Sequence, residues 1–467
     1  MLANAEIVRR FLELKHQVHP DVVNYIKEQN DPTLIDRIAA RVPDDTLVVS
    51  AEHIPGLKKV RDGTRFLVDP ELEVVVGSAG TTGSVIGHED AVHYFRDRYN
   101  NLSSMIRSRM NAMPIEALLK SPHRYRDEEC TIIGMVADTR TTAGGHRLVE
   151  LEDPTGTIPV LFNKGRRDSF AEAERILPDE VVGVKGKLSN DGGLLFADQL
   201  SRPDIPVNHA PFRSDRPGKA VLISDVHVGS NTFLEEAWNR FADWLQDSDA
   251  GYLLIAGDLV DGIGIYPGQE DELTIKNIYE QYDVFAEMLR DLPSRIRIVV
   301  APGNHDVVRM AEPQPAIPPE FTEKFPENCT LVENPCLLNL QGVRVLMYHG
   351  RSFDDMIGLI PGASYERPGE IMDEMLKRRL LAPPYGMRTP IAAMKTDRLI
   401  IDPIPEILLT GHVHICGITR YRGVLGVNAG TWQSQTSFQK QMNINPTPAR
   451  AFIVDLQTLQ PEVMDFS

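Results

Sequence analysis

Cysteine is scarce in this sequence, and its spacing excludes two kinds of site. The chain has 467 residues but only four cysteines, which are Cys130, Cys329, Cys336 and Cys416. No two of them have the CxxC spacing on which many zinc and redox sites depend. We therefore expect four buried free thiols, which fits a reducing cytoplasm.

Long apolar stretches are also missing. No uninterrupted apolar run approaches the roughly 20 residues that a membrane-spanning helix needs. The first residues, "MLANAEIVRRFLELKHQ", carry charges among their apolar positions, whereas a secretory signal places its charges ahead of the apolar run. The sequence therefore predicts neither a secretory signal nor a membrane anchor, and we expect a cytoplasmic protein.

Basic residues are outnumbered by acidic ones. The chain has 49 Lys and Arg against 66 Asp and Glu, which gives a formal net charge of -17. Proteins that hold nucleic acid by bulk electrostatics need an excess of cations that face the phosphates. An acidic surface that keeps the protein in solution is the simplest interpretation, and any nucleic-acid role must be local or depend on a partner.

The length and the residue patterns divide the chain into about three domains. Apolar residues at three-to-four spacing predict a small helical domain over residues 1–45, and residues 46–113 have the composition of a linker with short strands and one helix. Alternating apolar residues and glycine-marked turns predict a five-stranded all-β barrel over residues 114–205. A proline-rich linker at 206–218 leads to residues 219–467, where apolar runs alternate with helical segments and predict a layered α/β domain.

The run "ELEDPTGTIPVLF" resembles the central strand-turn-strand of OB-folds, which bind single strands through basic and aromatic side chains. Phe162 is the only aromatic residue between positions 130 and 162, so stacking partners for bases are few. A barrel that serves as a packing platform is an equally good interpretation. The cations that would contact a strand are Arg140, Arg147, Lys164, Arg166 and Arg167.

Five short apolar runs in residues 219–467 each end in a turn with Asp, Asn or His. Continuous apolar runs indicate strands buried on both faces, and side chains just past strand ends converge at one edge of a sheet. Taken singly, such an Asp is often a helix cap and such a His a buried polar group. Together they supply seven oxygen and nitrogen ligands, which suit two divalent ions such as Mn, Fe or Zn. The runs are "AVLIS" before Asp225 and His227, "YLLIA" before Asp258, "IRIVVAP" before Asn304, "VRVLMY" before His349, and "EILLT" before His412 and His414.

This order of turns resembles the calcineurin-like metallophosphoesterases, and all five of their motifs are present. The resemblance implies a calcineurin-like phosphoesterase domain, in which mixed sheets form a sandwich flanked by helices. It also implies how the ligands divide between the two metal ions. Asp225, His227 and His414 would hold one ion, Asn304, His349 and His412 would hold the other, and Asp258 would bridge them.

Next to the predicted ligand Asn304 lies a further imidazole. By the same resemblance, His305 would protonate the leaving oxygen or stabilise charge on the phosphoryl group. Asp306 would fix the tautomer of His305 by accepting its other N–H. The alternative is a degenerate domain without metals, but relatives of that kind lack several ligands and none is missing from this sequence.

A second resemblance covers more of the chain. The helical N-terminus, "YFRDRYNNLSSMI", the OB-like barrel and the phosphoesterase-like domain are together similar to the small subunit of archaeal family D DNA polymerase. The most specific stretches are "YHGRSFDDMI", "EMLKRRLLAPPYGMRTPIA" and "EILLTGHVH". One position departs from the family pattern, because Leu380 precedes "LAP" where a His is expected.

This resemblance implies a proofreading 3'–5' exonuclease that acts on DNA 3' ends. It also implies a large catalytic polymerase subunit as partner, carried on another chain. Two other functions stay open. A stand-alone metallophosphoesterase acting on nucleotides or small phosphoesters would not need the barrel, and a non-catalytic scaffold subunit would be expected to lack metal ligands.

A basic stretch precedes the last metal-binding turn of this acidic chain. Lys377, Arg378, Arg379 and Arg388 lie in "KRRLLAPPYGMRTP" and are predicted to guide a phosphate backbone. The alternative is an ordinary surface helix and loop whose charges are solvated.

Overall fold

The computed structural model describes residues 4–14, 16–29, 34–35, 38, 42, 48–49, 70–78, 88–125 and 128–467. The chain divides into two compact units. One comprises Met1–Leu67 with Asp247–Asp249, and the other, the main unit, comprises Val68–Gln246 with Ala250–Ser467.

The N-terminal unit is a small helical module, as its apolar spacing predicts. Helices α1 (Asn4–Glu13) and α2 (Pro20–Gln29) bury one apolar side each, represented by Phe11 and Ile26. Strands β1 (Gln17–Val18) and β2 (Val48–Val49) pair in parallel. The predicted segment beyond residue 50 lies outside the described residues until residue 70.

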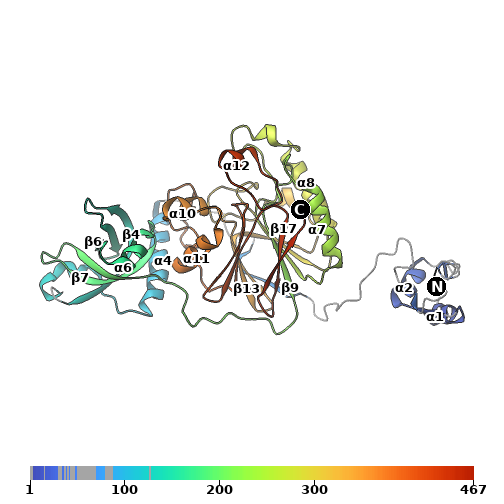
Figure 1. Cartoon of the computed structure of the whole chain (residues 1–467), viewed down its shortest axis with the longest axis horizontal. Coiled ribbons are helices and arrows are strands. Elements are labelled where there is room, and N and C mark those ends of the chain that lie inside the picture. Colours follow the sequence, from blue (N-terminus) through green and yellow to red (C-terminus); the bar gives the residue numbers. More distant parts are fainter. Residues whose placement is uncertain are drawn as a thin grey trace. The chain divides into compact units, whose positions relative to one another are not determined.

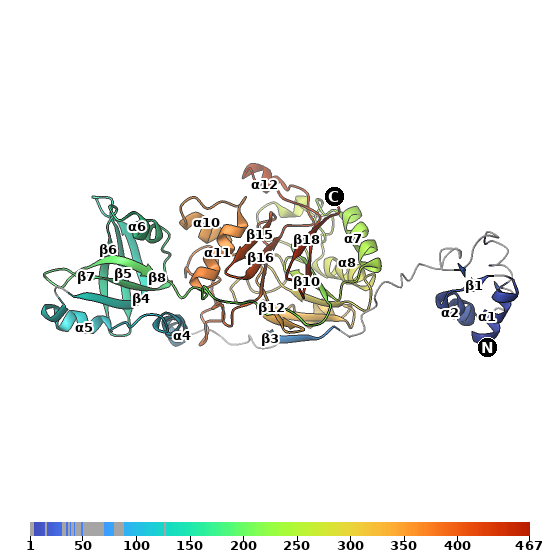
Figure 2. The ribbon, with the colours of Figure 1, turned by 60° about the horizontal axis from the view of Figure 1, so that its bottom comes forward.

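The first part of the main unit is a closed five-stranded barrel, which confirms the predicted barrel. Alternate residues of its strands point inward, so that Ile158, Val160 and Phe162 of one strand are all buried. Phe162 is therefore not exposed for stacking on a base. Figure 2 shows the barrel with its helices. Its elements are α5 (Ile115–Lys120), a 3-10 turn (Pro122–Tyr125), β4 (Glu129–Thr141), β5 (Arg147–Asp153), β6 (Gly156–Phe162), α6 (Arg167–Glu174), β7 (Val181–Leu188) and β8 (Leu195–Ser201).

The second part of the main unit contains two mixed sheets that share one strand. Strand β12 (Cys329–Leu340) pairs with β11 through its first residues and with β13 through its last. The strand order is β15-β16-β14-β13-β12-β11-β10-β9-β17-β18, with β3 also paired to β12. The other strands are β3 (Leu72–Ser78), β9 (Lys219–Ile223), β10 (Tyr252–Ala256), β11 (Arg297–Ala301), β13 (Val343–Met347), β14 (Ile407–Thr410), β15 (Cys416–Tyr421), β16 (Val424–Ala429), β17 (Arg450–Asp455) and β18 (Pro461–Asp465).

These sheets pack face to face and carry helices on their outer sides (Figure 1). The period-two pattern explains the layers, because Ala220 and Leu222 of β9 enter the core between the sheets while Val221 and Ile223 face the helices. Helices α7 and α8 cover one sheet, and α10 and α11 cover the other. The predicted mixed sheets with flanking helices are thus present. The helices are α7 (Glu235–Asp247), a 3-10 turn (Gln269–Glu272), α8 (Ile278–Arg290), α9 (Pro319–Thr322), α10 (Phe353–Leu359), α11 (Pro368–Arg378) and α12 (Ser437–Gln441).

Part of the segment predicted as a linker belongs to the main unit. Strand β3 pairs antiparallel with β12, and the helix α4 (His88–Arg107) buries Tyr94, Tyr99 and Leu102 in a core shared with α10 and α11. The Arg98 side chain on α4 is fully buried, and its Nε donates to Asp397 over 2.6 Å. This helix therefore packs as an integral element of the main unit.

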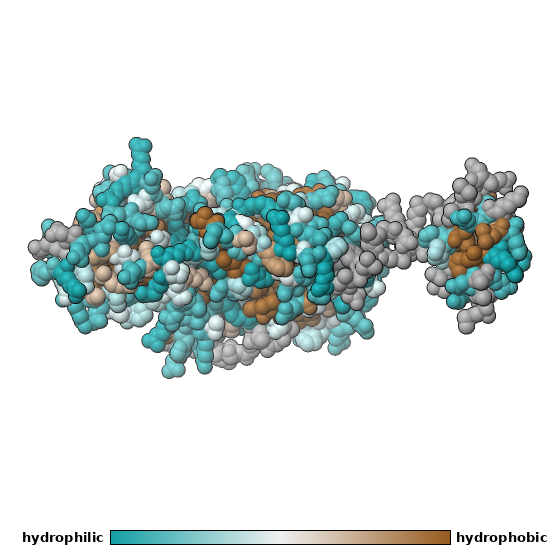
Figure 3. All heavy atoms as spheres, turned by 90° about the horizontal axis from the view of Figure 1, so that it is seen from below, coloured by the Kyte–Doolittle hydropathy of each residue, from teal (hydrophilic) through white to brown (hydrophobic). Residues whose placement is uncertain are grey.

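In the part of the chain that the structure describes, no helix is long and apolar enough to cross a membrane. On the face shown in Figure 3, the apolar residues of the main unit form separate groups among hydrophilic ones.

Candidate metal centre

Five strand ends bring the seven predicted ligands together at one edge of the sheets. Strands β9, β10 and β11 are mutually parallel, and β13 is parallel to β14, so each set of carboxyl ends lies on one side. The ligands follow these five strands directly in the sequence. The structure therefore places all seven where the strand-end pattern predicts them: Asp225, His227, Asp258, Asn304, His349, His412 and His414.

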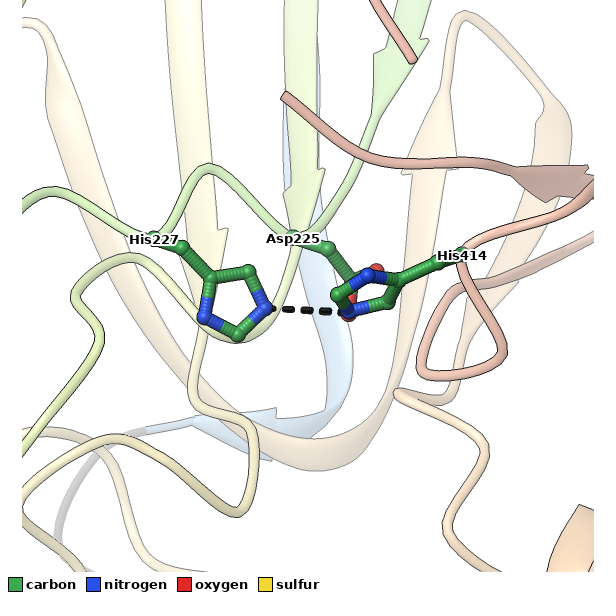
Figure 4. A group of neighbouring side chains, drawn as sticks. All are labelled: Asp225, His227 and His414. Carbon is green, nitrogen blue, oxygen red and sulfur yellow. Dashed lines mark hydrogen bonds and ion pairs between the residues drawn. The ribbon is translucent and has the colours of Figure 1, made fainter. Parts of the chain in front are cut away.

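One group of three ligands consists of Asp225, His227 and His414 (Figure 4). The two imidazole Nε2 atoms lie 3.1 Å apart, and His414 Nε2 lies 3.3 Å from Asp225 Oδ1. All three side chains are buried. Two imidazole nitrogens that face each other beside a carboxylate form a donor set that suits a divalent cation.

A second group lies beside the first. Asp258, His349 and His412 have ligand atoms within 4.8 Å of one another, and Asn304 Oδ1 lies 3.1 Å from His349 Nε2. Asp258 Oδ2 is 3.3 Å from His349 Nε2 and 3.7 Å from His227 Nε2. Its carboxylate thus reaches both groups, which is the position that a bridging ligand needs.

Carboxylates in these groups favour the charged forms of two of the imidazoles, those of His227 and His349. Burial alone would lower the pKa of His227 and His349, but the adjacent Asp225, Asp258 and Asp261 raise it to about 10 and about 9 respectively. Burial alone would raise the pKa of Asp225, but hydrogen bonds to His227 and His414 hold it well below its usual range. The site therefore balances its buried negative charge with nearby positive charge, as a bound cation would.

Asp261 orients two imidazoles and is not among the predicted site residues. Its Oδ1 lies 3.1 Å from His227 Nδ1, and its backbone oxygen lies 2.7 Å from His305 Nδ1. These contacts leave Nε2 of both rings directed toward the site. The signal in the sequence is its place three residues after Asp258, within the same turn.

The predicted role of Asp306 is wrong, because the Asp261 carbonyl occupies the position next to His305 Nδ1. Asp306 instead accepts from the backbone N–H of Gly303 over 2.8 Å and from the Tyr282 hydroxyl over 2.9 Å. Burial and the charge of Asp258 raise the pKa of Asp306 to about 7. Asp306 therefore stabilises, through these hydrogen bonds, the loop that carries Asn304 and His305.

Asp354 is a further carboxylate that sequence reasoning missed as a site residue. Its Oδ2 lies 3.2 Å from His412 Nε2, and it accepts a 2.7 Å hydrogen bond from the Tyr365 hydroxyl. Burial alone would raise the pKa of Asp354, but His412 holds it well below its usual range. Asp354 thus leaves His412 Nδ1 as the nitrogen available to a metal. It belongs to "YHGRSFDDMI", the stretch that marks the family resemblance.

The structure separates the four predicted DNA-contacting cations. Arg388 is exposed and lines the cavity above the metal centre. Arg378 and Arg379 are buried, so the prediction that they contact DNA is wrong. Arg378 pairs with Glu180 and Glu374, and Arg379 donates to the Ile401 carbonyl.

Lys377 and Leu380, in the same stretch of sequence, also lie apart from the candidate metal centre. Lys377 pairs with Glu374 over 3.0 Å and lines a different cavity, between the barrel and α11. Leu380 is fully buried in the core beneath α11. The departure from the family pattern at Leu380 therefore does not alter the lining of the metal-site cavity.

The loops that carry the predicted ligands contain strained backbone. Five of the seven ligands have positive φ values between 50° and 69°, a conformation that residues other than glycine rarely adopt. Each such residue costs of order 1–3 kcal/mol, and clusters of this kind occur where a site is held in a required geometry. The five are Asp225, His227, Asp258, His412 and His414.

Comparisons with known proteins define the class first. Residues 130–200 match the model of the OB-fold nucleic acid binding domain, and residues 220–415 match that of the B subunit of DNA polymerase alpha/epsilon. The barrel is thus similar to OB-fold domains, and the two-sheet domain is similar to B subunits of DNA polymerases.

Curated relatives define the family. The chain is 44% identical to the DNA polymerase II small subunit of Halobacterium salinarum over 421 residues, which cover 89% of this chain and 81% of the relative. It is 44% identical to that of Methanothermobacter thermautotrophicus, covering 81% and 80%, and 40% identical to that of Methanocaldococcus jannaschii, covering 87% and 71%. The chain belongs to the DNA polymerase II small subunit family.

Proposed function

We propose that this chain is the proofreading subunit of an archaeal family D DNA polymerase and hydrolyses phosphodiester bonds at DNA 3' ends. The observation that carries the proposal is the convergence of all seven predicted metal ligands within one buried cluster. A scaffold subunit without catalysis would not need seven such side chains, five of them on strained backbone.

The donor set fits two divalent ions, with Mn as the first candidate and Fe or Zn as alternatives. When bound, such a pair supplies Lewis-acid polarisation of a phosphate and a water of lowered pKa. Asp225, His227 and His414 would hold one ion, Asn304, His349 and His412 the other, and Asp258 would contact both.

The side chains around the ligands have separate tasks. His305 presents Nε2 to the cavity because its Nδ1 faces the Asp261 carbonyl, so it is placed to give a proton to the leaving oxygen. Arg388 supplies an exposed cation for a phosphate oxygen of the DNA. Asp354 and Asp261 act through the imidazoles that they orient.

A large catalytic subunit on another chain would supply most of the DNA affinity. The relatives are named small subunits, and a chain with net charge -17 neutralises few phosphates by itself. We expect weak binding to DNA by the isolated chain, and faster cleavage when the large subunit is added at low salt.

The test compares the ends of labelled DNA in the presence of Mn. We expect single-stranded or mispaired 3' ends to be shortened faster than matched 3' ends, and EDTA to stop the reaction. The isolated chain and its mixture with the large subunit are compared at two salt concentrations. Equal cleavage of simple phosphomonoesters would support the stand-alone phosphoesterase instead, and inactivity of the metal-loaded complex would support the scaffold.

A further inference from the structure

Helix α12 and the residue after it line the metal-site cavity. Their apolar side chains are exposed and a polar one is buried. Phe438 and Met442 lie one helical turn apart, are 57% and 56% exposed, and both line the cavity. Gln439 between them is 6% exposed. Surface helices normally bury their apolar side and expose their polar side, so this short helix presents apolar side chains to an open cavity.

The buried Gln439 fixes α12 to the metal centre. Its Nε2 lies 2.8 Å from His414 Nδ1, and its Oε1 accepts from the backbone N–H of Thr436 in a capping box at the start of the helix. The Thr436 hydroxyl in turn accepts from the backbone N–H of Gln439. Phe438 is therefore held at a defined place beside a predicted metal ligand.

The cavity also has charged and polar lining. Arg388, Asp354, Tyr365 and His305 line it together with several of the predicted ligands. The cavity has a volume of about 280 Å³, close to the lower end of the range for sites that bury a small ligand. Charged and apolar side chains that line one cavity beside the predicted metal ligands match a nucleotide, which carries a phosphate at one end and a flat, largely apolar base at the other.

We propose that Phe438 and Met442 form the subsite for the nucleobase of the 3'-terminal nucleotide, with Phe438 stacked on the base. The inference rests on the proposed function and adds the means by which the end is recognised. Stacking is tolerant of sequence because every base has a π-face. A base in a matched duplex is already stacked and paired, so only a frayed or mispaired end can place its base against Phe438.

The cleavage test combines a protein change with a substrate change. Phe438→Ala should lower kcat/KM on single-stranded 3' ends by about 5- to 100-fold, the range of one lost base-aromatic stack, and Phe438→Tyr should retain most activity. An abasic terminal nucleotide should cost the wild-type chain a similar factor and cost Phe438→Ala little more. Phe212→Ala is the matched control, because Phe212 is 50% exposed and does not line this cavity.

Two further measurements test the base subsite independently of the proposed exonuclease activity. Metal content should be the same in Phe438→Ala and wild type, which excludes an indirect effect through Gln439 and His414. In EDTA, where no cleavage occurs, a 3'-terminal 2-aminopurine should be quenched by the wild-type chain and by Phe212→Ala but not by Phe438→Ala.

The outcomes separate the two hypotheses. Quenching through Phe438 without cleavage by the metal-loaded chain would support the subsite and overturn the exonuclease. Cleavage with equal rates and equal quenching for wild type and Phe438→Ala would overturn the subsite alone. Additive losses from Phe438→Ala and the abasic end, or no quenching by the wild-type chain, would also overturn the subsite.

Discussion

Single residues of the candidate metal centre are proposed to have different tasks, some to hold a cation and one to move a proton. Asp258 is central to the first task, because its carboxylate lies between His349 and His227 and also accepts from the His305 backbone N–H over 2.8 Å. Asp258→Ala should abolish cleavage and reduce the number of bound divalent ions measured by elemental analysis, while far-UV circular dichroism stays unchanged. Normal metal content in this variant would contradict the bridging role.

His305 should show the reverse behaviour. Its imidazole lines the cavity without belonging to the seven predicted ligands, so His305→Ala should keep the metals and slow cleavage by roughly 10²- to 10⁴-fold, the usual contribution of a positioned acid. Metal content and single-turnover rates measured on one preparation make this test. Loss of metal from the variant would show that His305 is a ligand.

Asp261 contacts the predicted ligand His227 and is not itself a predicted ligand. It accepts from His227 and from the Gln433 amide through the same oxygen, so Asp261→Asn weakens the orientation of His227 without removing a ligand. We expect a roughly 10- to 100-fold loss of metal affinity, measured by titration of the metal-free chain. Asp243→Asn on α7 is the control, because Asp243 is exposed. Equal affinity in both variants would mean that Asp261 does not orient His227.

These residues also show how far the sequence predicts the site. The ligands are recognisable because each follows an apolar strand. The roles of Asp261 and Asp354 cannot be recognised from a strand pattern, because they depend on which imidazole each carboxylate contacts in the fold. The prediction for Arg378 and Arg379 is wrong because the sequence of a basic run does not show whether its side chains face solvent or pack against buried partners, here Glu180 and Glu374 for Arg378 and the Ile401 carbonyl for Arg379.

At the scale of elements, the loops after the strands leave no room beside Asp258. A Cβ on Gly303 would lie 2.5 Å from the Asp258 backbone nitrogen and would also overlap the Asp258 carboxylate. Gly303→Ala should therefore displace this carboxylate and lower metal content and cleavage together. Gly358→Ala on α10 is the control, because nothing lies within 4 Å of a Cβ there. Wild-type metal content in Gly303→Ala would show that the loop adjusts freely.

The elements that sequence patterns predict best are those with a strong local pattern. The continuous apolar run of β9 and the three-to-four spacing of α7 and α8 appear in the structure as a strand buried on both faces and the helices on one of them. Strand β3 and helix α4 instead fall in a segment with the composition of a linker. Their partners, β12 and the core beside α11, lie far along the chain, so no local pattern marks the association.

At the scale of the whole chain, buried ion pairs join the barrel to the two-sheet domain. Arg378 on α11 pairs with Glu180 of the barrel and with Glu374 on its own helix, and Arg175 of the barrel lies 3.1 Å from Glu374. Side chains at these pairs are largely buried, so each charge depends on its partner. Arg378, which is predicted from the sequence to contact DNA, thus joins the two domains of the main unit.

Glu374 gives this junction a pH dependence that can be measured. Burial alone would raise its pKa, but Arg378 and Lys377 lower the pKa to about 2. A carboxylate whose pKa is lower in the folded state than its usual value of 4.5 stabilises the fold above pH 4.5, and this contribution disappears as the pH falls toward 2. Glu374→Gln should therefore lower the unfolding free energy by about 3 kcal/mol at pH 7.

The difference from wild type should shrink steadily between pH 4.5 and pH 2, because protonation then removes the same charge from the wild-type chain. Urea unfolding midpoints followed by circular dichroism at several pH values make the measurement. Glu370→Gln is the matched control on the same helix, since Glu370 forms an exposed ion pair with Arg367 and should change stability by less than about 1 kcal/mol. A pH-independent gap for Glu374→Gln, or a loss equal to that of the control, would show that the junction does not depend on this charge.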